Sequence, residues 1–266
     1  MIVYLKGIAA TGPGFEDWNA LSKHLTSDVG LDPDFVPHPQ GDILSSVERR
    51  RASVTVKLAV DVAQAALQQS GMKSEDLALV FASSNGDTNT IHQICEALAT
   101  PERFVSPTRF HNSVHNAPAG YWSIATSSMQ PSSSICAWDD SFAAGLVEAA
   151  TQCVTENLPV LLAVFDTPFP EPLYEKTPGH QPFGVALVLD LIPDGSLAKM
   201  RIEVDGDVNL ATTPMANLQL EVIRCDSSAS RSLPLLAALA TPGANEVVLG
   251  YSGDLRLRIA VENLHR

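Results

Sequence analysis

The amino-acid sequence predicts an α/β layered fold, and three observations support that prediction. Residues 158–165 and 184–192 are continuous apolar runs, which are typical of strands buried on both faces of a sheet. These runs alternate with helical patterns, as in mostly parallel sheets that helices cover on both sides. Residues 142–150 are apolar on nearly every side, which favours a helix enclosed between two sheets. We therefore expect five layers in the order α-β-α-β-α.

The first elements follow from periodicity and turn residues. Residues 2–10 form an apolar run that predicts a buried strand, and a Gly-Pro-Gly turn at 12–14 leads into a helix that begins near Phe15. Residues 28–46 are rich in Asp, Pro and Gly and predict a loop. Residues 52–70 carry one apolar stripe and stop at Gly71, which makes them the clearest helix in the chain. Residues 77–82 predict the next strand.

The middle and end of the chain continue this alternation and then depart from it. A polar loop at 83–87 precedes a helical pattern that Pro101 ends. Helices are predicted at 111–126 and 142–153, with a short strand at 132–137 before the second helix. Beyond residue 193 we expect strands at 201–208, 218–223, 246–249 and 255–261 and a helix at 232–240. The pattern therefore divides the chain into residues 1–192 and a β-rich remainder, residues 193–266, integrated in one domain.

Charge and motif content exclude several classes of function. The formal net charge of −13 repels nucleic acid and anionic membranes. The longest apolar runs are far shorter than the roughly 20 residues that span a bilayer, so we expect no membrane insertion. The amino terminus lacks a secretory pattern, and a cytoplasmic location is expected. The four cysteines match neither a zinc pattern nor a disulfide framework, and no Gly-rich phosphate motif is present. We therefore expect no cofactor and no metal.

The strongest candidate for a chemical site is a strand-to-helix turn. The predicted strand at 132–137 runs into Trp138-Asp139-Asp140 and then into the apolar helix from Ser141. In a nucleophile elbow, the side chain at such a turn points into a pocket, and backbone N–H groups and the helix dipole stabilise negative charge there. Here the turn carries carboxylates.

These segments together resemble the β-ketoacyl synthase family of the thiolase-like superfamily. The matching segments are ERRR at 48–51, SSNG at 83–86, FHNSVHNAPAG at 110–120, the turn at 138–140, EAA at 148–150 and PFGVALVL at 182–189. The resemblance covers roughly residues 1–192. It implies a thiolase-like layered fold in which residues 193–266 are a shortened remnant of the second half.

The sequence departs from the family pattern at the residues that perform catalysis. The resemblance places the nucleophilic cysteine position at Asp139, or with a small slip at Trp138 or Asp140, whereas Cys136 lies three residues before Asp139. An aspartate there forms no stable acyl-enzyme with a thioester substrate. We expect Asp139 to cap the following helix instead. The family's two histidine motifs are also missing, since the loop residue His180 and the penultimate His265 match neither.

This combination resembles the chain-length-factor-like subunits, specifically the short ones of aryl polyene biosynthesis. The resemblance implies a noncatalytic subunit that pairs with an active β-ketoacyl synthase as a heterodimer and shapes the acyl or polyene tunnel. A shortened second half also leaves apolar edges for a large interface to cover. An acyl carrier protein, being acidic, would reach this acidic subunit only through the partner. The expected tunnel or interface residues are Phe110, His111, Val114, His115, Tyr121 and Trp122.

Other functions stay open at the sequence level. One alternative is a minimal condensing enzyme or acyltransferase that uses Cys136 as its thiol. Another is an acyl-binding scaffold protein without a synthase partner. His111 and His115 are spaced to share a helix face, but no third metal ligand lies nearby. The arginine run at 49–51 fits a salt-bridged helix start better than an anion site.

Overall fold

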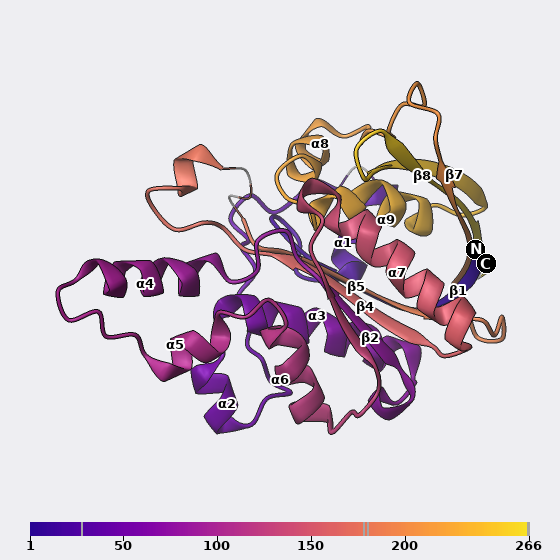
Figure 1. Cartoon of the computed structure of the whole chain (residues 1–266). Coiled ribbons are helices and arrows are strands. Elements are labelled where there is room, and N and C mark those ends of the chain that lie inside the picture. Colours follow the sequence, from indigo (N-terminus) through magenta and orange to yellow (C-terminus); the bar gives the residue numbers. More distant parts are fainter. Residues whose placement is uncertain (28, 178, 180, 265–266) are drawn as a thin grey trace.

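The computed structural model describes residues 1–264 except 28, 178 and 180, and excludes 265 and 266 (Figure 1). His180 and His265 therefore lie outside the described residues. The described residues form one sheet of eight strands in the order β3-β2-β4-β5-β1-β6-β8-β7. The strands are β1 (Ile2–Thr11), β2 (Ala78–Ala82), β3 (Ser132–Ile135), β4 (Val160–Asp166), β5 (Phe183–Asp190), β6 (Ala198–Asp205), β7 (Ala244–Tyr251) and β8 (Leu255–Asn263).

The pairing is mainly antiparallel, so the expectation of mostly parallel strands was wrong. Only β2 pairs in parallel, with β3 on one side and β4 on the other, among the described strand pairs. The pairs β4–β5, β5–β1, β1–β6, β6–β8 and β8–β7 are antiparallel. The apolar strands β4 and β5 are buried along their whole length, as expected. Continuous apolar character reports burial on both faces, and it does not fix strand direction.

The helices agree with the sequence at most places. They are α1 (Trp18–Thr26), α2 (Ser46–Arg51), α3 (Val54–Ser70), α4 (Thr88–Ala99), α5 (Pro107–Asn112), α6 (Ala117–Thr126), α7 (Ser141–Glu156), α8 (Leu218–Arg224) and α9 (Leu233–Ala240). Gly71 ends α3 in the left-handed region at φ +67°, where glycine is least strained. The helix expected over 111–126 is two helices, α5 and α6, because residues 113–116 interrupt the helical conformation.

One element has the wrong type in the sequence-based prediction. Residues 218–223, expected as a strand, lie in helix α8. The Asn217 side chain accepts hydrogen bonds from the N–H groups of Gln219 (2.8 Å) and Leu220 (3.3 Å), which starts the helix. Apolar residues alternate here as in a strand, but only Leu220 is buried and Leu218 is 80% exposed. A local cap therefore decides the conformation against the alternating pattern.

Two apolar layers cover opposite faces of the sheet. On one face α3 and α6 pack over Leu79, Phe81 and Phe165. On the other face α7, α1 and α9 pack over side chains such as Val80, Leu162 and Leu187. Helix α7 contacts β2 and β4 and also β7 from the far end of the sheet, and Figure 1 shows β7 and β8 beside α9. The apolar helix expected between two sheets thus lies between distant strands of one continuous sheet.

Helix α7 approaches the strands closely because of Gly145. A Cβ atom at this position would lie 3.0 Å from both the Ala82 Cβ and the Leu162 Cδ1. Since no side chain is present, the helix backbone packs directly over β2 and β4. This close packing fixes where the amino-terminal end of α7, and the turn that precedes it, lie relative to the sheet.

The part of the chain beyond residue 193 continues the same sheet. Strand β6 pairs with β1, and the outward face of β6, β8 and β7 carries ion pairs: Lys199 with Glu262 at 3.5 Å, and Arg258 with Glu246 at 3.2 Å. Charged pairs of this kind belong to a solvated surface. Among the helices that the structure describes, none combines the length and apolar character that crossing a bilayer requires.

Candidate functional site

Three loops meet at the carboxyl ends of the parallel strands. Strand β2 leads into residues 83–87, β3 leads into residues 136–140, and β4 ends at Asp166. Because β2, β3 and β4 run in the same direction, these ends lie at one edge of the sheet. In open α/β sheets this edge is the usual location of ligand and catalytic sites. The strand-to-helix turn that the sequence selected lies here.

Asp166 is the most buried carboxylate at this edge, with 5% of its surface exposed. Its Oδ1 accepts hydrogen bonds from the Ser83 hydroxyl (3.1 Å) and the Ser84 N–H (2.9 Å). Its Oδ2 accepts from the Ser228 hydroxyl (2.6 Å) and the Ala229 N–H (2.9 Å). Burial raises the pKa of Asp166, and the four donors oppose that shift. The carboxylate therefore joins the β2 loop to the carboxy-terminal part of the chain.

Asp166 is not among the site residues predicted from the sequence. The available signal was a single carboxylate directly after the apolar run at 158–165. A charge buried at such a place is costly unless hydrogen-bond donors surround it. Two of its four donors, Ser228 and Ala229, come from a segment more than 60 residues away, which no local pattern reveals.

His115 and Cys136 bind neighbouring carbonyl groups of the same loop. His115 Nε2 lies 3.1 Å from the Ser83 carbonyl oxygen, and the exposed Cys136 Sγ donates to the Ser84 carbonyl at 3.0 Å. The thiol has no hydrogen bond to an imidazole within the described part of the chain. Burial raises the pKa of the Cys153 thiol on α7 to about 12, so that cysteine is no nucleophile either.

The turn before α7 places Trp138 at the bend. Trp138 adopts φ +56°, a left-handed conformation that is costly for a bulky residue, and its side chain is 74% exposed. Ser141 closes the turn, since its Oγ accepts the Ala137 N–H at 3.0 Å and donates to the Trp138 carbonyl at 2.7 Å. The strained position of the elbow therefore carries an indole.

The expectation that Asp139 caps α7 was wrong. The Asp139 carboxylate instead forms an ion pair with Arg231, with Oδ2 2.8 Å from the guanidinium. Arg231 lies in a short turn after α8, so the partner comes from the carboxy-terminal part of the chain. The residue that precedes α7 is Asp140, whose side chain forms no cap hydrogen bond. The Asp139 carboxylate is therefore bound by the guanidinium of a residue distant in sequence, and not by the N–H groups at the start of α7.

The six residues expected at a tunnel or interface separate into two groups. His111, Val114 and Tyr121 line a groove of about 600 Å³ between α2, α5 and α6, together with Glu48 and Arg51. The Tyr121 hydroxyl donates to Asn112 Oδ1 at 3.0 Å, and burial raises its pKa. Phe110, His115 and Trp122 do not line this groove.

Each of the other three candidates has a different environment. Phe110 is 69% exposed on α5, and His115 contacts the Ser83 carbonyl. Trp122 is fully buried in the core between α6 and the sheet, and its indole N–H has no acceptor among the described residues. Their roles at a tunnel stay predictions.

Helices α4 and α5 and the segment between them have large apolar side chains that are exposed to solvent. Figure 1 shows α4 projecting from the sheet, with the connection to α5 at its far end. We call this segment, residues 88–114, the α4–α5 arm. Its exposed large apolar residues are Ile91 (43%), Leu98 (49%), Phe104 (77%), Phe110 (69%) and Val114 (51%). Several large apolar side chains exposed within one segment are typical of a protein–protein contact.

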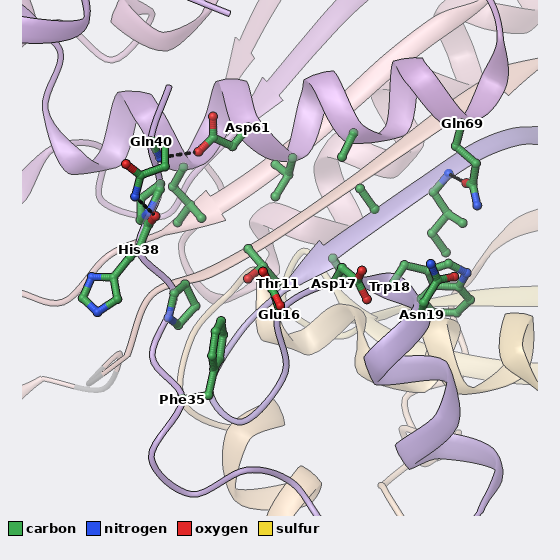
Figure 2. Close-up of a pocket in the computed structure, with 18 residues that line it drawn as sticks. Thr11, Glu16, Asp17, Trp18, Asn19, Phe35, His38, Gln40, Asp61 and Gln69 are labelled. Atoms are coloured by element: carbon green, nitrogen blue, oxygen red, sulfur yellow. Dashed lines mark hydrogen bonds between the residues drawn. The ribbon is translucent and has the colours of Figure 1, made fainter. Parts of the chain in front are cut away.

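A second cavity of about 590 Å³ lies between α3, α1, β1 and residues 35–40 (Figure 2). Asp61 accepts the N–H groups of Gln40 (2.7 Å) and Gly41 (2.9 Å), and Gln69 Oε1 accepts the Ile8 N–H at 2.6 Å. Burial raises the pKa of Asp61. These hydrogen bonds join residues 40–41 and strand β1 to helix α3.

The imidazoles and arginines singled out from the sequence have separate partners. His111 packs edge-on against Tyr121, with ring centroids 6.1 Å apart, whereas His115 contacts Ser83. In the described part of the chain no three potential metal ligands cluster. Arg49 forms an ion pair with Asp42 at 3.0 Å, which confirms the salt-bridged interpretation for that arginine.

Comparisons with known proteins agree with this architecture. The family model for the β-ketoacyl synthase N-terminal domain matches residues 18–240. A structure of the ketosynthase ApeO in complex with its chain length factor ApeC from Xenorhabdus doucetiae matches with TM-score 0.73 and 24% identity, over 98% of this chain and 99% of that one. The ishigamide ketosynthase/chain length factor matches with TM-score 0.73 and 13% identity, over 100% and 99%. A search of curated proteins found no match. The chain therefore belongs to the β-ketoacyl synthase N-terminal domain family and has its thiolase-like fold.

Proposed function

We propose that this chain is a noncatalytic, chain-length-factor-like subunit that pairs with an active β-ketoacyl synthase in aryl polyene-type biosynthesis. One observation carries the proposal: the strained elbow position before α7 holds Trp138, and the adjacent Asp139 is bound by Arg231. A condensing enzyme needs a thiolate at such a position to take the acyl group from a thioester. An indole and an ion-paired carboxylate cannot do this.

The surroundings of Cys136 support the same proposal. Its thiol donates to the Ser84 carbonyl at 3.0 Å, and no imidazole is hydrogen-bonded to it among the described residues. An attacking cysteine needs a base to take its proton, and the described hydrogen bonds join Cys136 to none. The partner would therefore provide the nucleophile, release the carrier thiol on acylation and catalyse the decarboxylative condensation.

The distribution of apolar surface supports a partner on one side of the molecule. The α4–α5 arm exposes large apolar side chains, and edge strand β3 has a neighbour on one side only among the described strands. The opposite edge, β7, is covered by Thr213, which exchanges hydrogen bonds of 2.8 and 2.9 Å with Val248. The outer face of β6, β8 and β7 carries ion pairs, which are typical of a surface exposed to solvent. A synthase docked on β3 and the arm would also extend the groove beside α5 and α6 into a shared tunnel.

The proposal also assigns a role to residues 193–266, a binding site for the acyl carrier protein and a location for the complex. Residues 193–266 serve as a shortened second half, joined to the first through Asp166 and the Asp139–Arg231 pair. The net charge of −13 disfavours direct docking of an acidic acyl carrier protein, which would bind the partner. The complex would act in the cytoplasm, where acyl carrier proteins and thioester substrates are found.

Co-expression tests the proposal. We expect this chain and its cognate β-ketoacyl synthase to co-elute in size-exclusion chromatography as a heterodimer that condenses acyl units, whereas this chain alone shows no condensation. A chain that stays monomeric beside the synthase, with the synthase fully active alone, would contradict the proposal.

The alternative of a condensing enzyme gives a separate prediction at Cys136. We expect Cys136→Ala to leave the condensation rate of the purified pair within about twofold, because the thiol performs no step. Loss of a true nucleophile would lower the rate by several orders of magnitude. Cys225→Ala, which also removes an exposed thiol and lies outside the α4–α5 arm, is the matched control. A large loss confined to Cys136→Ala would support the alternative.

A further inference from the structure

One wall of the cavity of about 590 Å³ beside β1 is the loop at residues 35–41 (Figure 2). At the start of this loop, the Phe35 carbonyl accepts the Gly14 N–H at 3.1 Å. At its end, two backbone N–H groups donate to the Asp61 carboxylate on α3 at 2.7 and 2.9 Å. Two of the residues between these contacts are prolines, whose rings fix the backbone angle φ. The wall is therefore held in place by contacts within the chain.

The floor of the cavity is apolar. Strand β1 and helix α3 form it, with the side chains of Ile8, Ala9, Ala10, Leu58, Val62 and Ala65. Two aromatic side chains, Trp18 and Phe35, also line the cavity. An apolar floor and a volume within roughly 300 to 1,000 Å³ are typical of pockets that bind small organic molecules.

The charged groups that line the cavity are acidic. Glu16, Asp17 and Asp61 contribute carboxylates, and none of the described lining residues is lysine or arginine. Figure 2 shows Asp61 on α3, apart from Glu16 and Asp17. Glu16 forms no hydrogen bond or ion pair within the described part of the chain, and Asp17 uses only Oδ1, which accepts the Ala20 N–H at 2.8 Å. A carboxylate or phosphate ligand would be repelled here, whereas a cation would be attracted.

We propose that this cavity binds a protonated organic amine, with the apolar body of the ligand on β1 and α3 and its ammonium group at Glu16 and Asp17. Aromatic rings such as those of Trp18 and Phe35 also attract a cation close to their faces. The net charge of −13 raises the concentration of cations around the chain. The inference does not depend on the proposed function, because three strands separate β1 from the edge strand β3.

Fluorine NMR of the full chain labelled with 5-fluorotryptophan tests the inference. The three tryptophans differ in position: Trp18 lines the cavity, Trp122 is buried in the core and Trp138 is exposed at the turn before α7. Trp18→Phe assigns the signal at the cavity. We expect hexylamine to shift the Trp18 signal alone, with a dissociation constant at least tenfold lower than that of hexanoate and with hexan-1-ol between them. Equal affinities for hexylamine and hexanoate, or no shift of the Trp18 signal, would overturn the inference.

A charge variant tests the contribution of the carboxylates. Glu16→Gln combined with Asp17→Asn removes both charges, and asparagine keeps the acceptor that caps α1. We expect this variant to bind hexylamine about tenfold more weakly than the wild-type chain and to bind hexan-1-ol equally well. Glu156→Gln combined with Asp207→Asn removes the same charges from residues that do not line the cavity and should stay within about twofold. Equal weakening in both variants would overturn the inference.

A second pair of variants tests the cavity itself. Ala65 is exposed on α3 and lines the cavity, so Ala65→Phe should fill it and abolish binding of hexylamine and hexan-1-ol. Gln68→Phe adds the same ring at an exposed α3 position outside the lining and should bind both as the wild-type chain does. Thermal melting checks that each variant is folded. Unchanged binding in Ala65→Phe would overturn the inference, as would a Trp18 signal that shifts with the synthase but not with the amine.

Discussion

Replacement of Asp166 by alanine should lower the free energy of unfolding by about 3 to 5 kcal/mol. The substitution leaves the N–H groups of Ser84 and Ala229 and the hydroxyls of Ser83 and Ser228 without their acceptor. Each buried unpaired donor costs roughly 1 to 3 kcal/mol, although such costs are not additive. Urea denaturation of the purified chain measures the effect.

The control for this prediction is Asp207→Ala. Asp207 is an exposed carboxylate that also accepts a backbone N–H, from Asn209 at 2.9 Å, but it does so at the surface. We expect its loss to change the free energy of unfolding by less than about 0.5 kcal/mol. Equal effects of the two substitutions would show that Asp166 does not join the two parts of the chain.

The pH dependence of the same residue has a definite sign. Burial raises the pKa of Asp166 in the folded state above its value in the unfolded chain. The stability that this group contributes is therefore fully present below about pH 4, the unfolded value, and decreases as the pH rises toward the folded value. Asp166→Asn cannot ionise, so the stability difference between wild type and this variant should shrink as the pH rises from about 4. A difference that grew with pH would contradict the assignment.

The largest effect on assembly is expected at the α4–α5 arm. Phe110→Asp should weaken synthase binding more than 100-fold, because a central aromatic anchor contributes about 2 to 4 kcal/mol or more to an interface and a carboxylate would be desolvated there. The monomer's melting temperature should change little, since the Phe110 side chain is 69% exposed. Surface plasmon resonance against the immobilised synthase gives the affinity.

Val208→Asp is the control for the arm. Val208 is also exposed, at 55%, but it follows β6, which four strands separate from β3 in the sheet. Its substitution should leave the affinity within about twofold. Similar losses for both variants would place the interface elsewhere or show a general effect of added charge.

Much of the fold was predictable from local sequence, and the exceptions share a cause. Helix α3 followed from one apolar stripe and Gly71, and strands β4 and β5 from continuous burial. Strand direction was mispredicted because it depends on how distant segments connect. Helix α8 was mispredicted because the Asn217 cap overrode an alternating pattern.

The local geometry of the candidate site was predictable only in part. The strand-to-helix turn expected at residues 138–140 is present, with Trp138 in a left-handed conformation, and the comparisons confirm the family; the functional role of the turn stays a prediction. The role of Asp139 was wrong because Arg231, 92 residues later, binds it. The left-handed conformation of Trp138 also depends on the closure of the turn by Ser141, a contact that sequence spacing alone does not reveal.

The most direct test of the noncatalytic role is the location of the acyl group during turnover. The purified pair would be incubated with an acyl-loaded carrier protein, quenched in acid and analysed by intact-protein mass spectrometry. We predict that the acyl mass is found on the synthase and that this chain keeps its unmodified mass. An acyl adduct on this chain that disappears in Cys136→Ala would contradict the account.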